Sequence, residues 1–261
     1  AGPRHLDLFP AGAQERSRLV LKEGERRAGV DIVLMPGGVE WAGVVRDPEG
    51  GWWGLAPRVA LRLYDGVVTR WELDAEASGA AAAGTGVAFV TDLGVRWWVR
   101  GARMLSPTQP LGFEVEDVAG TPEGTLWVAG FDRVVALRAG ERKDWEGLDP
   151  VYDLSVDREA VWVATSGGLV RIEPGQPAQR VDMKVDRLLG VGAGAGRLHV
   201  LDADGRLHRA DPDGLRTLDL SAYGTFTGET DIIGDEHGVW IASSAGLLRV
   251  VPVDGAPALS D

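Results

Sequence analysis

The chain has 261 residues, 44% hydrophobic and 25% charged, which is enough to bury the core of one all-β domain. A formal net charge of −12 at pH 7 opposes binding to phosphate backbones, so we expect no nucleic-acid partner. The absence of cysteine excludes disulfides and thiol catalysis, and 37 Gly with 14 Pro favour short strands joined by tight turns over a helical bundle.

The first 40 residues carry the weakest pattern. Arg18-Leu19-Val20-Leu21 is similar to Arg197-Leu198-His199-Val200-Leu201 further along the chain, which places a strand near residues 18–21. We predict that His5–Phe9 or Leu19–Leu21 supplies a strand that completes the last repeat and closes a ring. The alternative is that residues 1–40 form a separate β segment.

From residue 41 onward, a repeat of an acidic or glycine turn followed by an aromatic-centred apolar strand runs to the C-terminus. Trp162–Arg171 and Trp240–Arg249 align without a gap, and weaker copies surround Trp53, Phe89, Trp127 and His199. The six aligned positions, 53, 89, 127, 162, 199 and 240, are 36, 38, 35, 37 and 41 residues apart. That period is typical of a four-stranded propeller blade.

These repeats predict a single all-β domain over residues 1–261, a β-propeller of four-stranded blades. One small sheet cannot bury both of its faces, so the blades stack side by side into a ring. Chain length divided by the period, 261/37, gives about 7, so we favour seven blades; six blades with an N-terminal appendage is the alternative. The glycine and alanine run at Gly190–Gly196 fits an innermost strand, where only small residues pack.

At the two best copies, the repeat resembles the two-component regulator propeller repeat. The shared features are an acidic-Gly turn as in Asp235–Trp240, a Trp-aliphatic strand, a Ser or Thr, and Gly-Leu before the next strand. The resemblance implies an extracytoplasmic, bacterial sensor propeller that binds a glycan or another ligand. Quinoprotein-like and lyase-type propellers are related alternatives.

Tryptophan is frequent, and its spacing decides what it does. Because Trp53, Trp127, Trp162 and Trp240 recur once per blade, we assign them to the core between blades. Four other tryptophans lie outside this register and are expected to be more exposed: Trp71, Trp97, Trp98 and Trp145.

Candidate chemistry is sparse. Asp202-Ala203-Asp204-Gly205 has the beginning of a calcium loop but lacks its further acidic ligands, and Asp-Gly is a common hairpin turn. His199 fills the aromatic position of its repeat, so we expect a packed core histidine, and only His199 and His208 could face each other across a hairpin. His208, His237 and Glu236 are a minor candidate acid–base group. We predict no metal and no cofactor.

The remaining candidate site follows from propeller geometry. Turns between the second and third strands of all blades converge on one rim with the inter-blade connections. The aligned turn residues vary chemically although their flanking strands repeat, and this variation marks them as the predicted ligand-binding set: Arg58, Asp92, Asp132, Ser166, Asp202 and Ser243.

The sequence therefore predicts a non-catalytic propeller module that binds a protein, glycan or other small ligand on one rim, with an extracytoplasmic location favoured over a cytoplasmic one. Two alternatives stay open. One is a propeller lyase or hydrolase with a central His and carboxylate site. The other is a structural scaffold of an envelope assembly. No segment approaches the roughly 18 apolar residues that a membrane-spanning helix needs.

Overall fold

A computed structural model describes residues 4–8, 17–21, 43–65, 67–194, 197–211, 214–223, 226–227, 230–235, 238–243 and 246–250. These residues form antiparallel strands and one short 3-10 turn, η1 (Ser221–Tyr223), which confirms the all-β prediction. No helix in this part of the chain is long and apolar enough to cross a membrane.

Each repeat folds into one sheet, called a blade here. Blade 1 contains β3 (Gly43–Arg46), β4 (Trp52–Ala56), β5 (Val59–Tyr64) and β6 (Val67–Glu72), and blade 2 contains β7 (Ala77–Ala83), β8 (Gly86–Thr91) and β9 (Gly94–Val99). Blade 3 contains β10 (Asp117–Gly120), β11 (Leu126–Gly130), β12 (Arg133–Arg138) and β13 (Glu141–Glu146). Blade 4 contains β14 (Val151–Asp157), β15 (Ala160–Thr165), β16 (Gly168–Ile172) and β17 (Gln179–Val181). Blade 5 contains β18 (Leu188–Gly194), β19 (Arg197–Asp202), β20 (Arg206–Asp211) and β21 (Gly214–Asp219), and blade 6 contains β22 (Asp231–Asp235), β23 (Gly238–Ser243) and β24 (Gly246–Val250).

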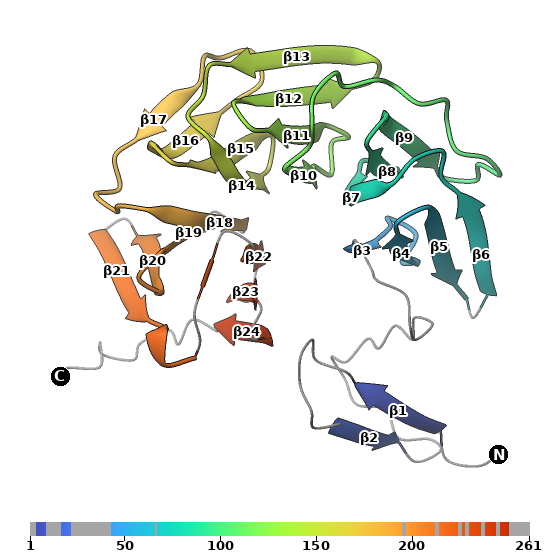
Figure 1. Cartoon of the computed structure of the whole chain (residues 1–261), viewed down its shortest axis with the longest axis horizontal. Helices are drawn as coiled ribbons and strands as arrows, with labels where there is room; N and C mark the ends of the chain where they lie inside the picture. Colours follow the sequence, from blue (N-terminus) through green and yellow to red (C-terminus); the bar gives the residue numbers. More distant parts are fainter. Residues whose placement is uncertain are drawn as a thin grey trace.

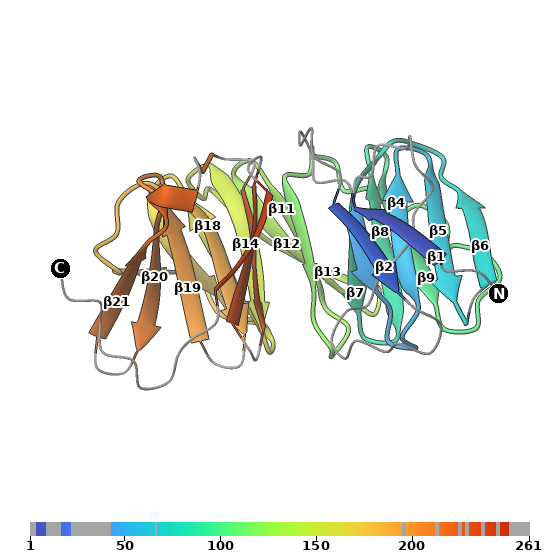
Figure 2. The ribbon, with the colours of Figure 1, turned by 90° about the horizontal axis from the view of Figure 1, so that it is seen from below.

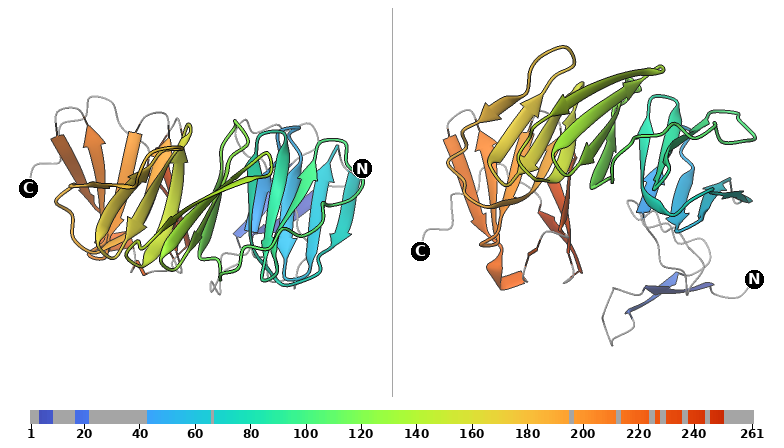
Figure 3. Two further views of the ribbon diagram at one scale, coloured as in Figure 1. Left: turned by 90° about the horizontal axis from the view of Figure 1, so that it is seen from above. Right: turned by 45° about the horizontal axis from the view of Figure 1, so that its top comes forward.

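The blades follow one another around a common centre (Figure 1), with the first strand of each blade innermost and the last outermost. Seen from the side, their strands run between two faces of the molecule (Figure 2; Figure 3). Strand order within every blade follows chain order, so consecutive strands are joined by short hairpin turns.

The N-terminal strands do not join the described sheet of the last blade, although the sequence predicts that one of them completes it. β1 (Arg4–Leu8) and β2 (Ser17–Leu21) are strands where the pattern placed them, but they pair with each other, and β24 remains the outer strand of its described sheet. Blades 6 and 1 stand apart in Figure 1, and the β1–β2 hairpin lies on that side of the arc. Ring closure and a seventh blade stay predictions.

Blade 2 has three strands instead of four. The segment after β9 turns back along it, and only Gln109 forms a bridge, with Val95. Ser106 strengthens this contact, because its amide donates to the Trp97 carbonyl at 2.8 Å and its hydroxyl accepts from the Trp97 amide at 2.9 Å. Pro107 and Pro110 flank the bridge, and proline cannot donate to a ladder, so no regular fourth strand forms.

Buried apolar residues form five clusters, each between two successive blades. The second strand of a blade serves two of them: Leu126 and Val128 face blade 2, while Trp127 and Ala129 face blade 4. Because side chains alternate across a strand, a strand between two sheets must be apolar on both faces. This is why the strand-two segments are continuous apolar runs in the sequence.

The first two recurring tryptophans, Trp53 and Trp127, occupy this inter-blade core as predicted, whereas Trp162 and Trp240 are less buried. Trp53 and Trp127 are fully buried, and Trp162 is half-buried against blade 5. Trp240 is also half-buried, since Val239 and Ile241 beside it face blade 5 and no described sheet follows blade 6.

Phe89 does not occupy the equivalent position that the alignment gave it. It packs back onto blade 1, with its ring centroid 5.0 Å from that of Trp53, whereas the other aligned residues face the following blade. Trp98 and Trp145 also correct an expectation of greater exposure: they are 2% and 8% exposed. Trp71 and Trp97 are half-buried.

Innermost strands approach each other closely, as the glycine and alanine runs predict. A Cβ on Gly192 would lie 2.7 Å from Cγ2 of Ile232 in blade 6. We therefore expect Gly192→Ala to destabilise the protein by about 1–3 kcal/mol through overpacking. Urea unfolding measures this loss. The control is Ser166→Ala, at an exposed turn, which should change stability by less than about 0.5 kcal/mol. An exposed glycine such as Gly140 is not a suitable control, because its φ is positive and alanine there would be strained.

Candidate ligand-binding face

One face of the molecule collects the turns between second and third strands together with the inter-blade connections. We call it the rim face. Backbone hydrogen bonds join the two kinds of segment: the Ala77 amide donates to Pro57, the Val151 amide to Phe131 and the Ala203 amide to Arg187. The two kinds of segment therefore meet on one face, as the sequence predicts. Main-chain hydrogen bonds between these segments hold the rim face together.

The predicted site residues lie in or beside these turns. Arg58, Asp92, Asp132 and Ser166 are exposed there. Of Ser243, only its place at the end of β23 is described. These residues come from successive blades, so they are distributed around the face and do not form one compact cluster.

Asp202 differs from the exposed turn residues because its carboxylate is buried. Oδ1 accepts from the amides of Asp204 and Arg206, both at 2.9 Å, and Oδ2 lies 2.8 Å from His208 Nε2. The second ring nitrogen of His208 is 3.0 Å from the Thr217 hydroxyl. These contacts fix the turn around Gly205, whose φ is +79°, as expected for an Asp-Gly turn.

The two blade 5 histidines do not face each other. His208 lies opposite Val200 in the ladder and His199 opposite Arg209, so their side chains leave opposite faces of the sheet. His199 is buried, which confirms the expectation of a packed histidine. His237 and Glu236 lie outside the described residues, and among those described no group of three acidic or histidine side chains has metal-binding geometry.

Large apolar side chains are exposed on the same rim face, next to the predicted residues. Leu93 follows Asp92 and is 55% exposed, while Phe131 precedes Asp132 and is 63% exposed. Tyr152 in β14 and Tyr223 in η1 add two aromatic side chains, 42% and 66% exposed. The Val151–Phe131 backbone bond brings Tyr152 beside the Phe131 turn.

Charge on the turns and connections of this face is predominantly negative. The exposed acidic residues there include Asp74, Glu76, Asp92, Glu114, Glu116, Asp132, Asp182, Asp186 and Asp204, and the exposed basic residues include Arg58, Arg180, Lys184 and Arg187. Salt bridges of Asp132 with Arg133 and of Asp204 with Arg187 neutralise only part of this charge. The rim face therefore combines separate apolar side chains with a negative field.

Three more aspartates stand at the start of inner strands, at the centre of the same face: Asp117, Asp153 and Asp231. Two of them accept hydrogen bonds from the next blade: Asp117 Oδ2 accepts the Leu154 amide of blade 4 at 2.9 Å, and Asp153 Oδ2 accepts the Val191 amide of blade 5 at 2.7 Å. Asp117 and Asp153 also hydrogen-bond to each other, which requires that the pair hold a proton.

Electrostatics at these central carboxylates favour protonation. Burial raises the pKa of Asp117 to about 6. Burial, together with the neighbouring Asp117 carboxylate, raises the pKa of Asp153 well above its usual value. Desolvation also raises the pKa of Asp231. The sequence contained a signal that could have found them, since these aspartates precede Trp127, Trp162 and Trp240 by 10, 9 and 9 residues.

No family model and no curated protein matches the sequence. Solved structures with similar folds include a streptogramin B lyase (13% identity, TM-score 0.63, covering 90% of this chain and 83% of that one). Another is YCF48 bound to D1 peptide (14% identity, TM-score 0.61, covering 83% and 79%). A third is the extracellular domain of the hybrid two-component system BT3049 from B. thetaiotaomicron (12% identity, TM-score 0.51, covering 78% and 39%). At these identities the similarity is one of fold, and it shows that the chain is an all-β protein of propeller-like sheets.

Proposed function

We propose that this chain is a non-catalytic binding module whose rim face recognises a positively charged peptide segment that carries apolar side chains. The observation that carries the proposal is the set of exposed apolar residues on that face, Leu93, Phe131, Tyr152 and Tyr223, on turns and connections where carboxylates outnumber basic side chains. Exposed aromatic side chains in a polar surround are typical anchors of protein–protein contacts.

The negative charge gives such a face a preference among peptides. Carboxylates at exposed turns attract a cationic partner over distances of about the Debye length, roughly 10 Å at 0.1 M salt, and this raises the association rate. Phe131 and Tyr152 then supply the contact area that slows dissociation. Phe131 stands on a turn and Tyr152 in β14, and the Val151–Phe131 backbone hydrogen bond ties the two segments together, so little ordering is required on binding.

The similar structures support this reading of the fold without assigning it. One of them is a propeller bound to a peptide, and another is the extracellular domain of a two-component system. By analogy we place this module outside the cytoplasm, as a sensing or recognition part of a larger assembly.

The test uses two synthetic peptides, Lys-Leu repeats and Glu-Leu repeats of equal length, labelled with fluorescein. We expect the Lys-Leu peptide to raise fluorescence anisotropy on titration, and the Glu-Leu peptide to give no binding. Combining Phe131→Ala with Tyr152→Ala should weaken binding at least about tenfold. Raising the salt concentration from 20 to 200 mM should also weaken binding of the Lys-Leu peptide to the unmodified protein, because association becomes slower.

The matched control combines Val67→Ala with Val68→Ala, which removes two side chains of similar exposure (63% and 62%) from the outer strand β6. This control should bind the Lys-Leu peptide as the unmodified protein does. Equal affinity for the two peptides, or equal weakening by both double variants, would show that the rim face is not the recognition surface.

A further inference from the structure

A hollow lies between the outer parts of blades 1 and 2. It has a volume of about 420 Å³ and is lined by Glu49, Arg62, Thr69, Trp71, Trp98, Gly101, Ala102 and Arg103. A volume of this size accommodates a small organic molecule. We call it the outer groove.

The groove exists because two neighbouring blades differ in width. Blade 1 has a fourth strand, β6, and Thr69 and Trp71, two residues apart in it, both lie on the face toward blade 2. Blade 2 ends at β9, so no fourth strand covers these side chains, and only the turn at residues 101–103 approaches them. Like the other four contacts between successive blades, the contact between blades 1 and 2 has a buried apolar cluster, and the groove borders this cluster at Trp98.

Two indole groups form the apolar part of the groove, and both are held in place. Trp71 Nε1 donates to the Arg103 carbonyl at 3.3 Å, and Trp98 Nε1 donates to the Ala102 carbonyl at 3.1 Å. Trp98 is almost fully buried and carries the Arg62 guanidinium 4.4 Å from its ring centroid. Trp71 is only half-buried, so its ring is the aromatic surface left for a ligand.

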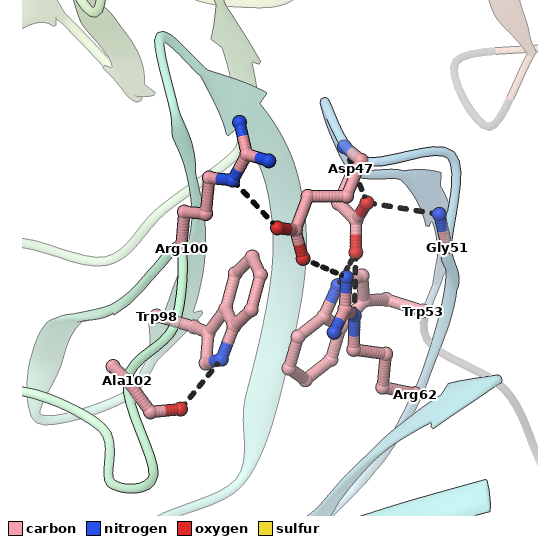
Figure 4. A network of polar contacts seen from close by, with 8 residues as sticks. Asp47, Gly51, Trp53, Arg62, Trp98, Arg100 and Ala102 are labelled. Atoms are coloured by element: carbon pink, nitrogen blue, oxygen red, sulfur yellow. Dashed lines mark hydrogen bonds and ion pairs between the residues drawn. The ribbon is translucent and has the colours of Figure 1, made fainter. Parts of the chain in front are cut away.

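Charge in the groove is positive overall, in contrast to the whole chain. Arg62 bonds Asp47 at 2.6 Å and Glu49 at 2.7 Å, and Arg100 bonds the other oxygen of Glu49 at 2.7 Å (Figure 4). Two carboxylates thus face these two guanidinium groups. Arg103 supplies a third guanidinium group. Its side chain is exposed and forms no ion pair with any residue that the structure describes.

We propose that the outer groove binds a small molecule consisting of a planar ring and a carboxylate, with the ring against Trp71 and the carboxylate on Arg103. Arginine is suited to this role because its planar guanidinium donates two parallel hydrogen bonds to a carboxylate. The groove lies near the ends of β9 and the β3–β4 turn, on the face opposite the rim turns. It is therefore a site separate from the peptide-binding face.

The probe is indole-3-acetate, and indole-3-acetamide is the uncharged analogue of the same shape. Saturation-transfer difference NMR with the whole chain measures both dissociation constants. We expect a Kd of about 1 mM for indole-3-acetate, the range for a ligand of its size, and binding about fivefold weaker or more for the amide. Arg103→Glu should weaken indole-3-acetate at least about tenfold while leaving the amide unchanged.

Trp71→Ala should abolish binding of both probes, with near-UV circular dichroism used to verify the fold. Arg103→Glu alters only an exposed side chain, so it tests the site even where the tryptophan variant loses structure. Arg138→Ala, at an exposed arginine of blade 3, is the control and should bind both probes normally. Equal affinity of the acid and the amide, an unchanged Kd in Arg103→Glu, or no signal at 10 mM would overturn the proposal.

Discussion

Replacing Asp117 by asparagine should make the protein more stable at pH 7.5 and remove much of the dependence of its stability on pH between about 4 and 6. In the unmodified protein, Asp117 and Asp153 share a proton at the centre of the rim face. Asparagine keeps an oxygen for the Leu154 amide and offers an N–H to Asp153 without requiring that proton.

The sign follows from the direction of the pKa changes. Burial raises the pKa of folded Asp117 to about 6 from its usual 3.8, so between these values the folded state holds a proton that the unfolded state has lost. Stability is therefore greatest below about pH 4 for this group and falls as the pH rises through 6. One pKa unit corresponds to about 1.4 kcal/mol, so the loss is on the order of 2–3 kcal/mol.

Other carboxylates act in a different pH window. Burial opposes ionisation of Asp47, but hydrogen bonds from Arg62, Gly51 and Trp53 hold its pKa below the usual value. A hydrogen bond from Arg142 does the same for Asp144. A lowered folded pKa contributes stability above about pH 4 that is lost on further acidification. The change in stability between about pH 4 and 6 therefore comes from the central aspartates and not from Asp47 or Asp144.

Thermal unfolding at pH 4.5, 6.0 and 7.5 measures this effect. The Asp117→Asn variant should have a Tm higher than the unmodified protein by roughly 4–10 °C at pH 7.5 and by much less at pH 4.5. Asp132→Asn, an exposed carboxylate on the same face, is the control and should shift Tm by about 1 °C or less. A Tm lowered equally at all three pH values would show that the second Asp117 oxygen is needed as an acceptor and that no proton is shared.

The sequence predicts the blades well because a local pattern determines them. A strand buried on both faces must be continuously apolar, and a hairpin turn needs Asp, Gly or Asn, so both signals recur with each repeat. The pattern fails at the fourth strand of blade 2, where Ser106–Pro110 follows β9 without forming a ladder. It also fails at Phe89, since a register change of one residue moves a side chain to the opposite face of the sheet.

The candidate sites were harder to predict because they depend on distances between blades. Asp117 and Asp153 are 36 residues apart in the sequence, and their contact arises only when inner strands approach a common centre. Trp98 and Trp145 are buried by the packing of the blades, and their indole N–H groups donate to the carbonyls of Ala102 and Gln176. The spacing of tryptophans along the sequence predicts neither the packing nor these hydrogen bonds. Exposure of Phe131 likewise depends on its place in a turn.

Replacing Asp47 by alanine should cause the largest loss of stability, about 3–5 kcal/mol. The Asp47 side chain is completely buried and accepts from the amides of Glu49 and Gly51, from Trp53 Nε1 and from Arg62 Nε. Removing it leaves the half-buried Arg62 cation with Glu49 alone and leaves the buried indole N–H without its acceptor (Figure 4). The two blades that share the Trp53 core are destabilised together.

Urea unfolding measures the loss, and Asp47→Asn should show about half of it, because the amide keeps one acceptor oxygen but presents N–H groups to Arg62 or Trp53. Glu159→Ala, in an exposed turn of blade 4 where its partner is Arg138, is the control and should cost less than about 0.5 kcal/mol. A loss below about 1 kcal/mol for Asp47→Ala would mean that solvent replaces the carboxylate and that the network does not stabilise blade 1. Because Asp47 lies opposite the rim turns, the folded fraction of Asp47→Ala should still bind the Lys-Leu peptide.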